Sequence, residues 1–78
     1  MNDIYEELVR IVVELSDETP ERIGPATTFG ELDLDSLSLI EISMRVERRL
    51  GVVLDDAELG AELTLAGTAE LIGARRAG

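Results

Sequence analysis

The chain has 78 residues, no cysteine and no histidine, and its 17 acidic residues against seven basic ones give a formal charge of −10. The length predicts one domain over residues 1–78, and the missing residue types exclude disulfides, thiolate metal sites and histidine-based catalytic triads, which disfavours an enzyme. The acidic charge disfavours nucleic acid and anionic membranes as partners. No apolar run reaches the ~20 residues of a membrane span. We expect a cytoplasmic protein that is a monomer.

The first predicted element is a helix that begins near Asp3 and fades near Ser16. Asp3 with Glu6 fits a capping box at its start. Apolar residues recur along it at three-and-four spacing, which predicts one buried face. These residues are Ile4, Leu8, Ile11, Val12 and Leu15.

Residues 17–35 hold no sustained period and predict a long loop. One helical turn can form at residues 19–22, with Pro20 at its first position. Three isolated apolar residues, Ile23, Phe29 and Leu32, interrupt the loop. Because a loop this long in a small domain is either functional or anchored, we expect these three to pin it to the core.

The second helix is expected from about Ser36 to Leu50, with Asp35 as its N-cap and Gly51 as its C-terminal stop. At ~100° of rotation per residue, four apolar residues fall on one side and predict a stripe that faces the core. This core stripe consists of Leu39, Ile42, Val46 and Leu50.

A second apolar stripe runs along roughly the opposite side of the same helix. It consists of Leu37, Ile40 and Met44. Its flanks carry the charged residues Glu41, Glu47 and Arg48. Since a helix in so small a domain seldom buries both sides, we expect this stripe to be exposed, as a partner-binding surface with a charged rim. The alternative is that both stripes belong to the core.

The last third of the chain predicts one short and one longer helix. Residues 52–54 (Val-Val-Leu) are expected to be extended or irregular and buried. Asp55 with Glu58 fits a capping box, which predicts a short helix over Asp56–Leu59, and Thr64 can cap a final helix. The inward residues of that final helix are Leu65, Ala69 and Ile72. The fold class is therefore all-α: a small four-helix bundle of three longer helices and one short one, with a long loop between helices 1 and 2.

Ser36 lies in the first turn of the second helix, where the helix dipole favours an anion such as a phosphate ester. The neighbouring Asp33 and Asp35 oppose that effect. A serine needs an oriented base to act as a nucleophile, and the chain offers none. The residues alone thus leave two interpretations, a modified serine or an ordinary Asp35-Ser36 capping pair, of which capping is the commoner.

The segment Leu32-Asp33-Leu34-Asp35-Ser36-Leu37, with Ile40, Glu41 and Glu47 after it, resembles the acyl carrier protein family. The resemblance implies a four-helix carrier that is not an enzyme. It further implies that a phosphopantetheinyl transferase moves 4′-phosphopantetheine from coenzyme A onto Ser36, and that the thiol of this arm holds acyl groups as thioesters. A chain without cysteine could serve thioester chemistry in this way.

The same resemblance implies a docking surface for partner enzymes. The partners are the transferase, an acyl-loading enzyme (acyltransferase or ligase) and a ketosynthase or other processing enzyme. The implied docking residues are Asp35, Leu37, Ile40, Glu41, Met44 and Glu47. The residues Leu39, Ile42 and Val46 of the core stripe would line an interior that shelters a short acyl chain.

Two departures from the family pattern stand out. Many members have glycine where this chain has Asp33, so we expect a different loop backbone there. Arg45, Arg48 and Arg49 lie among the acids of the docking helix. One interpretation is helix-internal pairing, with Arg45 and Arg48 four and seven residues from Glu41. The other is that the carrier is tuned to dedicated partners of a polyketide or other natural-product pathway.

Two other functions remain as alternatives. An aminoacyl or peptidyl carrier of a nonribosomal pathway usually has glycine immediately before the serine, so Asp35 speaks against it. A non-carrier helical adaptor would bind proteins through the stripe of Leu37, Ile40 and Met44 without any modification of Ser36.

Overall fold

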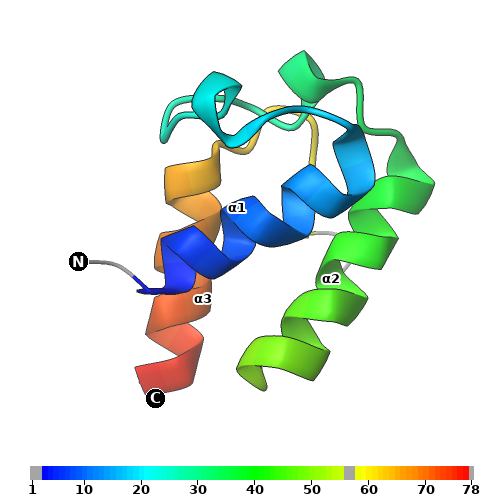
Figure 1. Ribbon diagram of the computed structural model, residues 1–78. Coiled ribbons are helices and arrows are strands. Elements are labelled where there is room, and N and C mark those ends of the chain that lie inside the picture. Colours follow the sequence, from blue (N-terminus) through cyan, green and yellow to red (C-terminus); the bar gives the residue numbers. More distant parts are fainter. Residues whose placement is uncertain (1–2, 56–57, 78) are drawn as a thin grey trace.

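The computed structural model describes residues 3–55 and 58–77, and this part of the chain is helical. The elements are α1 (Asp3–Ser16), the 3-10 turns η1 (Pro20–Arg22) and η2 (Gly30–Leu32), α2 (Ser36–Leu50) and α3 (Leu65–Ala77). Helix α1 packs against both α2 and α3, which begin at the same end of the molecule and run in a similar direction (Figure 1). The described residues contain no strand beyond one isolated bridge between Thr28 and Thr64. The all-α prediction is confirmed.

The short helix predicted for Asp56–Leu59 falls partly on residues 56 and 57, which lie outside the described residues. One half of the predicted capping box is present, since the Asp55 N–H donates to Glu58 Oε1 at 2.9 Å. The fourth helix of the bundle therefore stays a prediction, and the three longer helices are confirmed.

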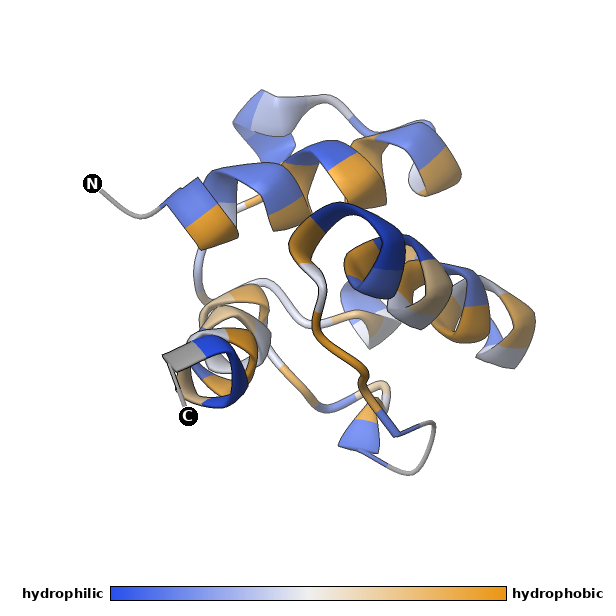
Figure 2. Cartoon of the chain, turned by 90° about the horizontal axis from the view of Figure 1, so that it is seen from below, coloured by the Kyte–Doolittle hydropathy of each residue, from blue (hydrophilic) through white to orange (hydrophobic). Residues whose placement is uncertain are grey.

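Helix α1 buries one face, as its periodicity predicts. Leu8, Ile11 and Val12 are fully buried, and apolar residues alternate with polar ones along the helices (Figure 2). Asp3 already lies inside the helix, so the prediction that Asp3 is the cap is wrong. The residues before Asp3 lie outside the described residues.

The long connection between α1 and α2 is anchored by its apolar residues. Ile23 and Phe29 are buried, and Leu32 packs against the core while half-buried, which confirms the predicted pinning. The predicted helical turn is η1, with Pro20 at its first position. The sequence did not indicate η2.

Backbone hydrogen bonds also hold this connection against the segment that precedes α3. The Phe29 N–H donates to the Leu63 carbonyl at 3.2 Å, and the Gly30 N–H donates to the Ala61 carbonyl at 2.9 Å. Gly30 suits this approach because a Cβ there would lie only 3.1 Å from the Ala61 oxygen. The paired backbone groups need no water, so the connection can lie close on the helices and end at a fixed position before α2.

The segment after α2 differs from its prediction at one residue. Val52 and Leu54 are buried, but Val53 is 65% exposed. An extended segment directs successive side chains to opposite sides, so Val53 points outward while its neighbours point inward. Arg75 of α3 holds this segment by donating to the Val53 carbonyl at 3.0 Å and by pairing with Glu58.

Helix α3 begins as predicted at the Thr64 cap, whose Oγ1 accepts the Gly67 N–H at 2.9 Å. Its predicted inward residues Leu65, Ala69 and Ile72 are all buried. None of the helices in residues 3–55 and 58–77 has the length and apolar character needed to cross a membrane.

Candidate functional site

Ser36 and Asp35 have separate roles at the start of α2. Asp35 is the N-cap in an extended conformation, and its Oδ1 accepts the Ser38 N–H at 2.8 Å. This backbone hydrogen bond lowers the pKa of the Asp35 carboxyl below its ordinary value. Ser36 is exposed, and its hydroxyl forms no hydrogen bond with the described residues. Asp35 is therefore confirmed as the predicted N-cap, and the Ser36 hydroxyl takes no part in the capping.

The backbone just before the site takes a conformation that suits glycine. Asp33 has φ 57° and ψ 33°, which is the left-handed region, and its N–H donates to the Gly30 carbonyl at 3.1 Å. Asp33 thus fits a glycine-type position at some conformational cost, and its presence does not require a changed backbone. Leu34 is buried and fixes the segment that leads to Ser36.

The stripe that begins beside Ser36 is exposed to solvent. Leu37 is 72% exposed, Ile40 38% and Met44 48%. On the other side of α2, Ile42 and Val46 are fully buried, and the other two core-stripe residues are half-buried. The alternative in which both stripes are core is therefore wrong.

A small hollow of ≈ 120 Å³ lies beside the serine, lined by Ser36, Leu39, Ile40 and Leu59. Of the residues predicted to line an acyl-binding interior, only Leu39 borders it. The hollow is well below the ~300 Å³ at which ligand pockets usually begin, so this conformation does not enclose a long chain. Sequence spacing does not indicate that Leu59 borders this hollow, because folding brings it to α2 from the segment before α3.

A larger hollow of ≈ 500 Å³ lies between α1 and η1 and shares no residue with the one at Ser36. Tyr5, Val9 and Ile23 are among the residues that line it. Within residues 3–55 and 58–77, no three side chains of the metal-binding types cluster closely enough to hold an ion.

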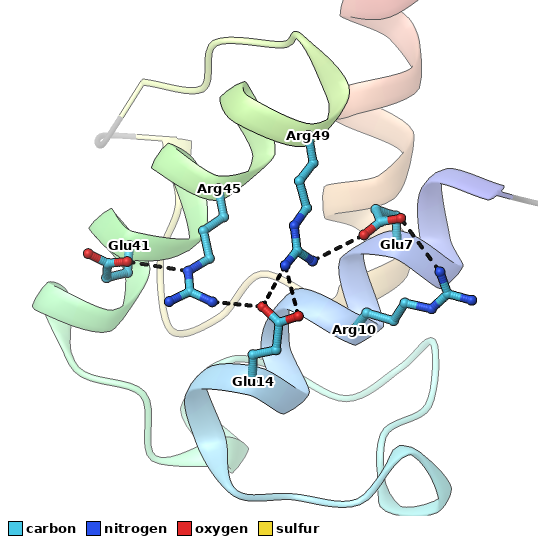
Figure 3. A network of polar contacts seen from close by, with 6 residues as sticks. All are labelled: Glu7, Arg10, Glu14, Glu41, Arg45 and Arg49. Carbon is cyan, nitrogen blue, oxygen red and sulfur yellow. Dashed lines mark hydrogen bonds and ion pairs between the residues drawn. The ribbon is translucent and has the colours of Figure 1, made fainter.

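Ion pairs between α1 and α2 account for two of the three arginines on α2 (Figure 3). Arg45 Nη1 lies 2.7 Å from Glu14 Oε1, and Arg49 Nη2 lies 2.8 Å from Glu14 Oε2. Arg49 Nη1 also lies 3.1 Å from Glu7 Oε2. The hydrogen bond from Arg49 lowers the pKa of the Glu14 carboxyl. These contacts connect the two helices and were not predicted.

The predicted helix-internal pairing is confirmed only in part. Arg45 Nε lies 3.4 Å from Glu41 Oε2, as the four-residue spacing suggests. Arg48, in contrast, forms no ion pair with Glu41 or with any other residue that the structure describes.

Comparison with known proteins shows the family of this helical chain. Residues 6–72 match the family described as "Phosphopantetheine attachment site". The chain belongs to the acyl carrier protein family. It is a carrier and not an enzyme, and the cofactor of its family is covalently attached phosphopantetheine.

Three relatives show the range of the similarity. The chain is 38% identical over 68 residues to the polyketide-8 synthase acyl carrier protein 2 of Streptomyces avermitilis, covering 86% of this chain and 78% of that relative. It is 54% identical over 37 residues to the granaticin polyketide synthase acyl carrier protein of Streptomyces violaceoruber, covering 47% of this chain and 44% of that relative. It is 33% identical over 64 residues to the meromycolate extension acyl carrier protein of Mycolicibacterium aurum, covering 81% of this chain and 66% of that relative.

Proposed function

We propose that this acyl carrier protein serves a polyketide-type pathway and carries its 4′-phosphopantetheine arm on the hydroxyl of Ser36. The observation that carries the proposal is the division of roles at the start of α2. Asp35 caps the helix, while the adjacent Ser36 is exposed with a hydroxyl that has no described partner. The polyketide assignment draws on the names of two relatives.

The surroundings of Ser36 fit a phosphate ester. The N-terminal end of α2 favours negative charge, because the aligned dipoles of its peptide groups leave a partial positive charge at that end. Asp33 and Asp35 oppose the added charge, and a basic transferase surface would offset them during modification. The attached arm supplies a terminal thiol for thioesters, which the chain itself lacks for want of cysteine.

Partner enzymes would dock beside the modified serine. The exposed stripe of Leu37, Ile40 and Met44 offers apolar contact, and carboxylates border it. Those docking carboxylates are Asp35, Glu41 and Glu47. The transferase, the acyl-loading enzyme and the ketosynthase must all reach the same serine or its arm, so they would use this surface one at a time.

Sheltering of the acyl chain would begin at the hollow between Ser36 and Leu59. Since ≈ 120 Å³ accommodates only a short segment, a longer chain requires Leu59 to separate from Leu39 and Ile40. A short acyl group can begin to enter beside the arm without displacing the buried residues of α2.

The function is tested by loading the protein after modification. The purified chain is treated with coenzyme A and a promiscuous phosphopantetheinyl transferase, then offered a malonyl-transferring acyltransferase or an amino-acid-activating enzyme. Intact mass should show the arm and then a malonyl group. An amino acid in its place would support the aminoacyl-carrier alternative, and the absence of any arm would support the adaptor. Equal use by housekeeping fatty-acid enzymes and polyketide enzymes would contradict the specialised pathway.

A further inference from the structure

The three arginines of α2 differ in what they can offer to a partner. Arg45 and Arg49 extend toward α1, where Glu14 contacts both of them and Glu7 contacts Arg49 (Figure 3). Their charges are therefore largely balanced within the molecule, and a partner would have to break ion pairs to use them.

Arg48 has no such partner because of its position. The residues three and four places before it, which face it on the helix, are Arg45 and Met44. Those three and four places after it are Gly51 and Val52, beyond the end of α2, and none of the four is acidic. Glu47 is adjacent in sequence but lies about 100° around the axis from Arg48. The guanidinium is exposed and lines a shallow hollow of ≈ 370 Å³ with Met44 and Glu47.

Arg48 continues the exposed stripe of α2. At ~100° per residue it lies only about 20° around the axis from Leu37, whereas Arg45 and Arg49 lie about 80° and 120° away. With a rise of 1.5 Å per residue, Arg48 lies about 17 Å along the helix from Leu37, which is next to Ser36. The surface thus carries Asp35 and Glu41 toward the serine end, and at the far end it carries the unpaired cation of Arg48 beside Glu47.

We infer that Arg48 is a specificity-determining contact for partner enzymes whose docking surface combines basic side chains near the active-site entrance with a carboxylate about 17 Å away. The inference rests on the proposed function. A carboxylate opposite Arg48 adds an attraction, while a surface that is basic throughout places like charges together. Arg48 therefore favours one set of carrier-using enzymes and disfavours another, which is how an interface discriminates between partners.

The test uses two ketosynthases as probes, chosen by their own structures. The docking surface of one is uniformly basic, and that of the other includes a carboxylate at the stated distance. The carriers compared are the wild type, Arg48→Glu, Arg48→Gln and Arg76→Glu, all modified with phosphopantetheine and acylated. Arg76 is exposed in the last turn of α3, has no described ion pair, and its reversal changes the net charge by the same amount as Arg48→Glu.

With the uniformly basic enzyme, Arg48→Glu should raise kcat/KM about 3- to 10-fold, and with the other enzyme it should lower kcat/KM by a similar factor. Arg48→Gln should fall between wild type and Arg48→Glu, and Arg76→Glu should stay within about twofold of wild type for both enzymes. Changes of the same sign with both enzymes, an equal effect of Arg76→Glu, or no effect of Arg48→Glu would overturn the inference.

Intact mass of each carrier separates this inference from the proposed function. If wild-type Ser36 takes up no arm, the proposed function fails. If all four carriers take up the arm and acyl group equally but the ketosynthase rates do not distinguish them, only the role of Arg48 fails.

Discussion

The buried side chain of Phe29 anchors the connection before Ser36, so truncating it should lower the free energy of unfolding. Phe29 is the largest fully buried side chain of the described residues, and its carbonyl accepts the N–H groups of Leu32 and Leu34. Truncating a buried phenylalanine to alanine costs about 3–5 kcal/mol, and Phe29→Leu should cost about 1 kcal/mol. A domain of 78 residues has a free energy of unfolding of about 4–12 kcal/mol. Phe29→Ala should therefore remove a quarter or more of the stability.

Urea unfolding and thermal melting, each followed by far-ultraviolet circular dichroism, measure this loss as a change in the free energy of unfolding and in Tm. We expect Tm to fall by about 4–8 °C for Phe29→Leu and by at least about 12 °C for Phe29→Ala. Val53→Ala is the matched control, because Val53 is apolar but 65% exposed, and its change should stay within about 0.5 kcal/mol. A loss below about 1 kcal/mol for Phe29→Ala would refute the reasoning that this side chain anchors the connection.

Three further predictions concern charge, backbone and docking. The pKa values of Glu14, Asp35 and Glu58 are all lowered from their ordinary values, which are 4.5 for the two glutamates and 3.8 for the aspartate. Their ionised carboxylates therefore stabilise the folded state above these values, and this stabilisation is lost as pH falls below them. Melting curves should show stability declining on acidification through this range, and Glu14→Gln should be less stable at neutral pH with a shallower decline; an unchanged pH profile would contradict the ion-pair assignment. Asp33→Gly should stay within about 1 kcal/mol of wild type in urea unfolding while Asp33→Val costs about 1–3 kcal/mol, because only the β-branched residue resists a positive φ. Equal stabilities of the two variants would count against the left-handed backbone. Leu37→Asp should leave stability within about 0.5 kcal/mol but lower ketosynthase kcat/KM about tenfold, whereas the similarly exposed Val53→Asp should not; equal losses would remove Leu37 from the docking surface.

The helices that bear the site were predictable because their signals are local. Asp35 and Gly51 mark the ends of α2 by chemistry that acts within a few residues, and the structure has these same bounds. Periodicity also separated the exposed stripe of Leu37, Ile40 and Met44 from the buried one. Ser36 was different, since its position alone suited an ordinary cap, and only the surrounding motif pointed to the acyl carrier family.

Contacts between distant segments could not be predicted in the same way. The pairing of Glu14 with Arg45 and Arg49 depends on which face of α1 meets α2, and spacing within one helix does not contain that information. The outward position of Val53 depends on how an extended segment crosses the core. The approach of Leu59 to Ser36 likewise requires the chain to return after α2.

The attachment of phosphopantetheine to Ser36 is tested most directly by locating the modification within the chain. After treatment with coenzyme A and a phosphopantetheinyl transferase, tandem mass spectrometry of the peptides should find the arm on Ser36. Ser36→Ala should prevent modification, and Ser38→Ala, one residue beyond Leu37 on the same helix, should still accept the arm. An arm found on another residue, or retained by Ser36→Ala, would contradict the account.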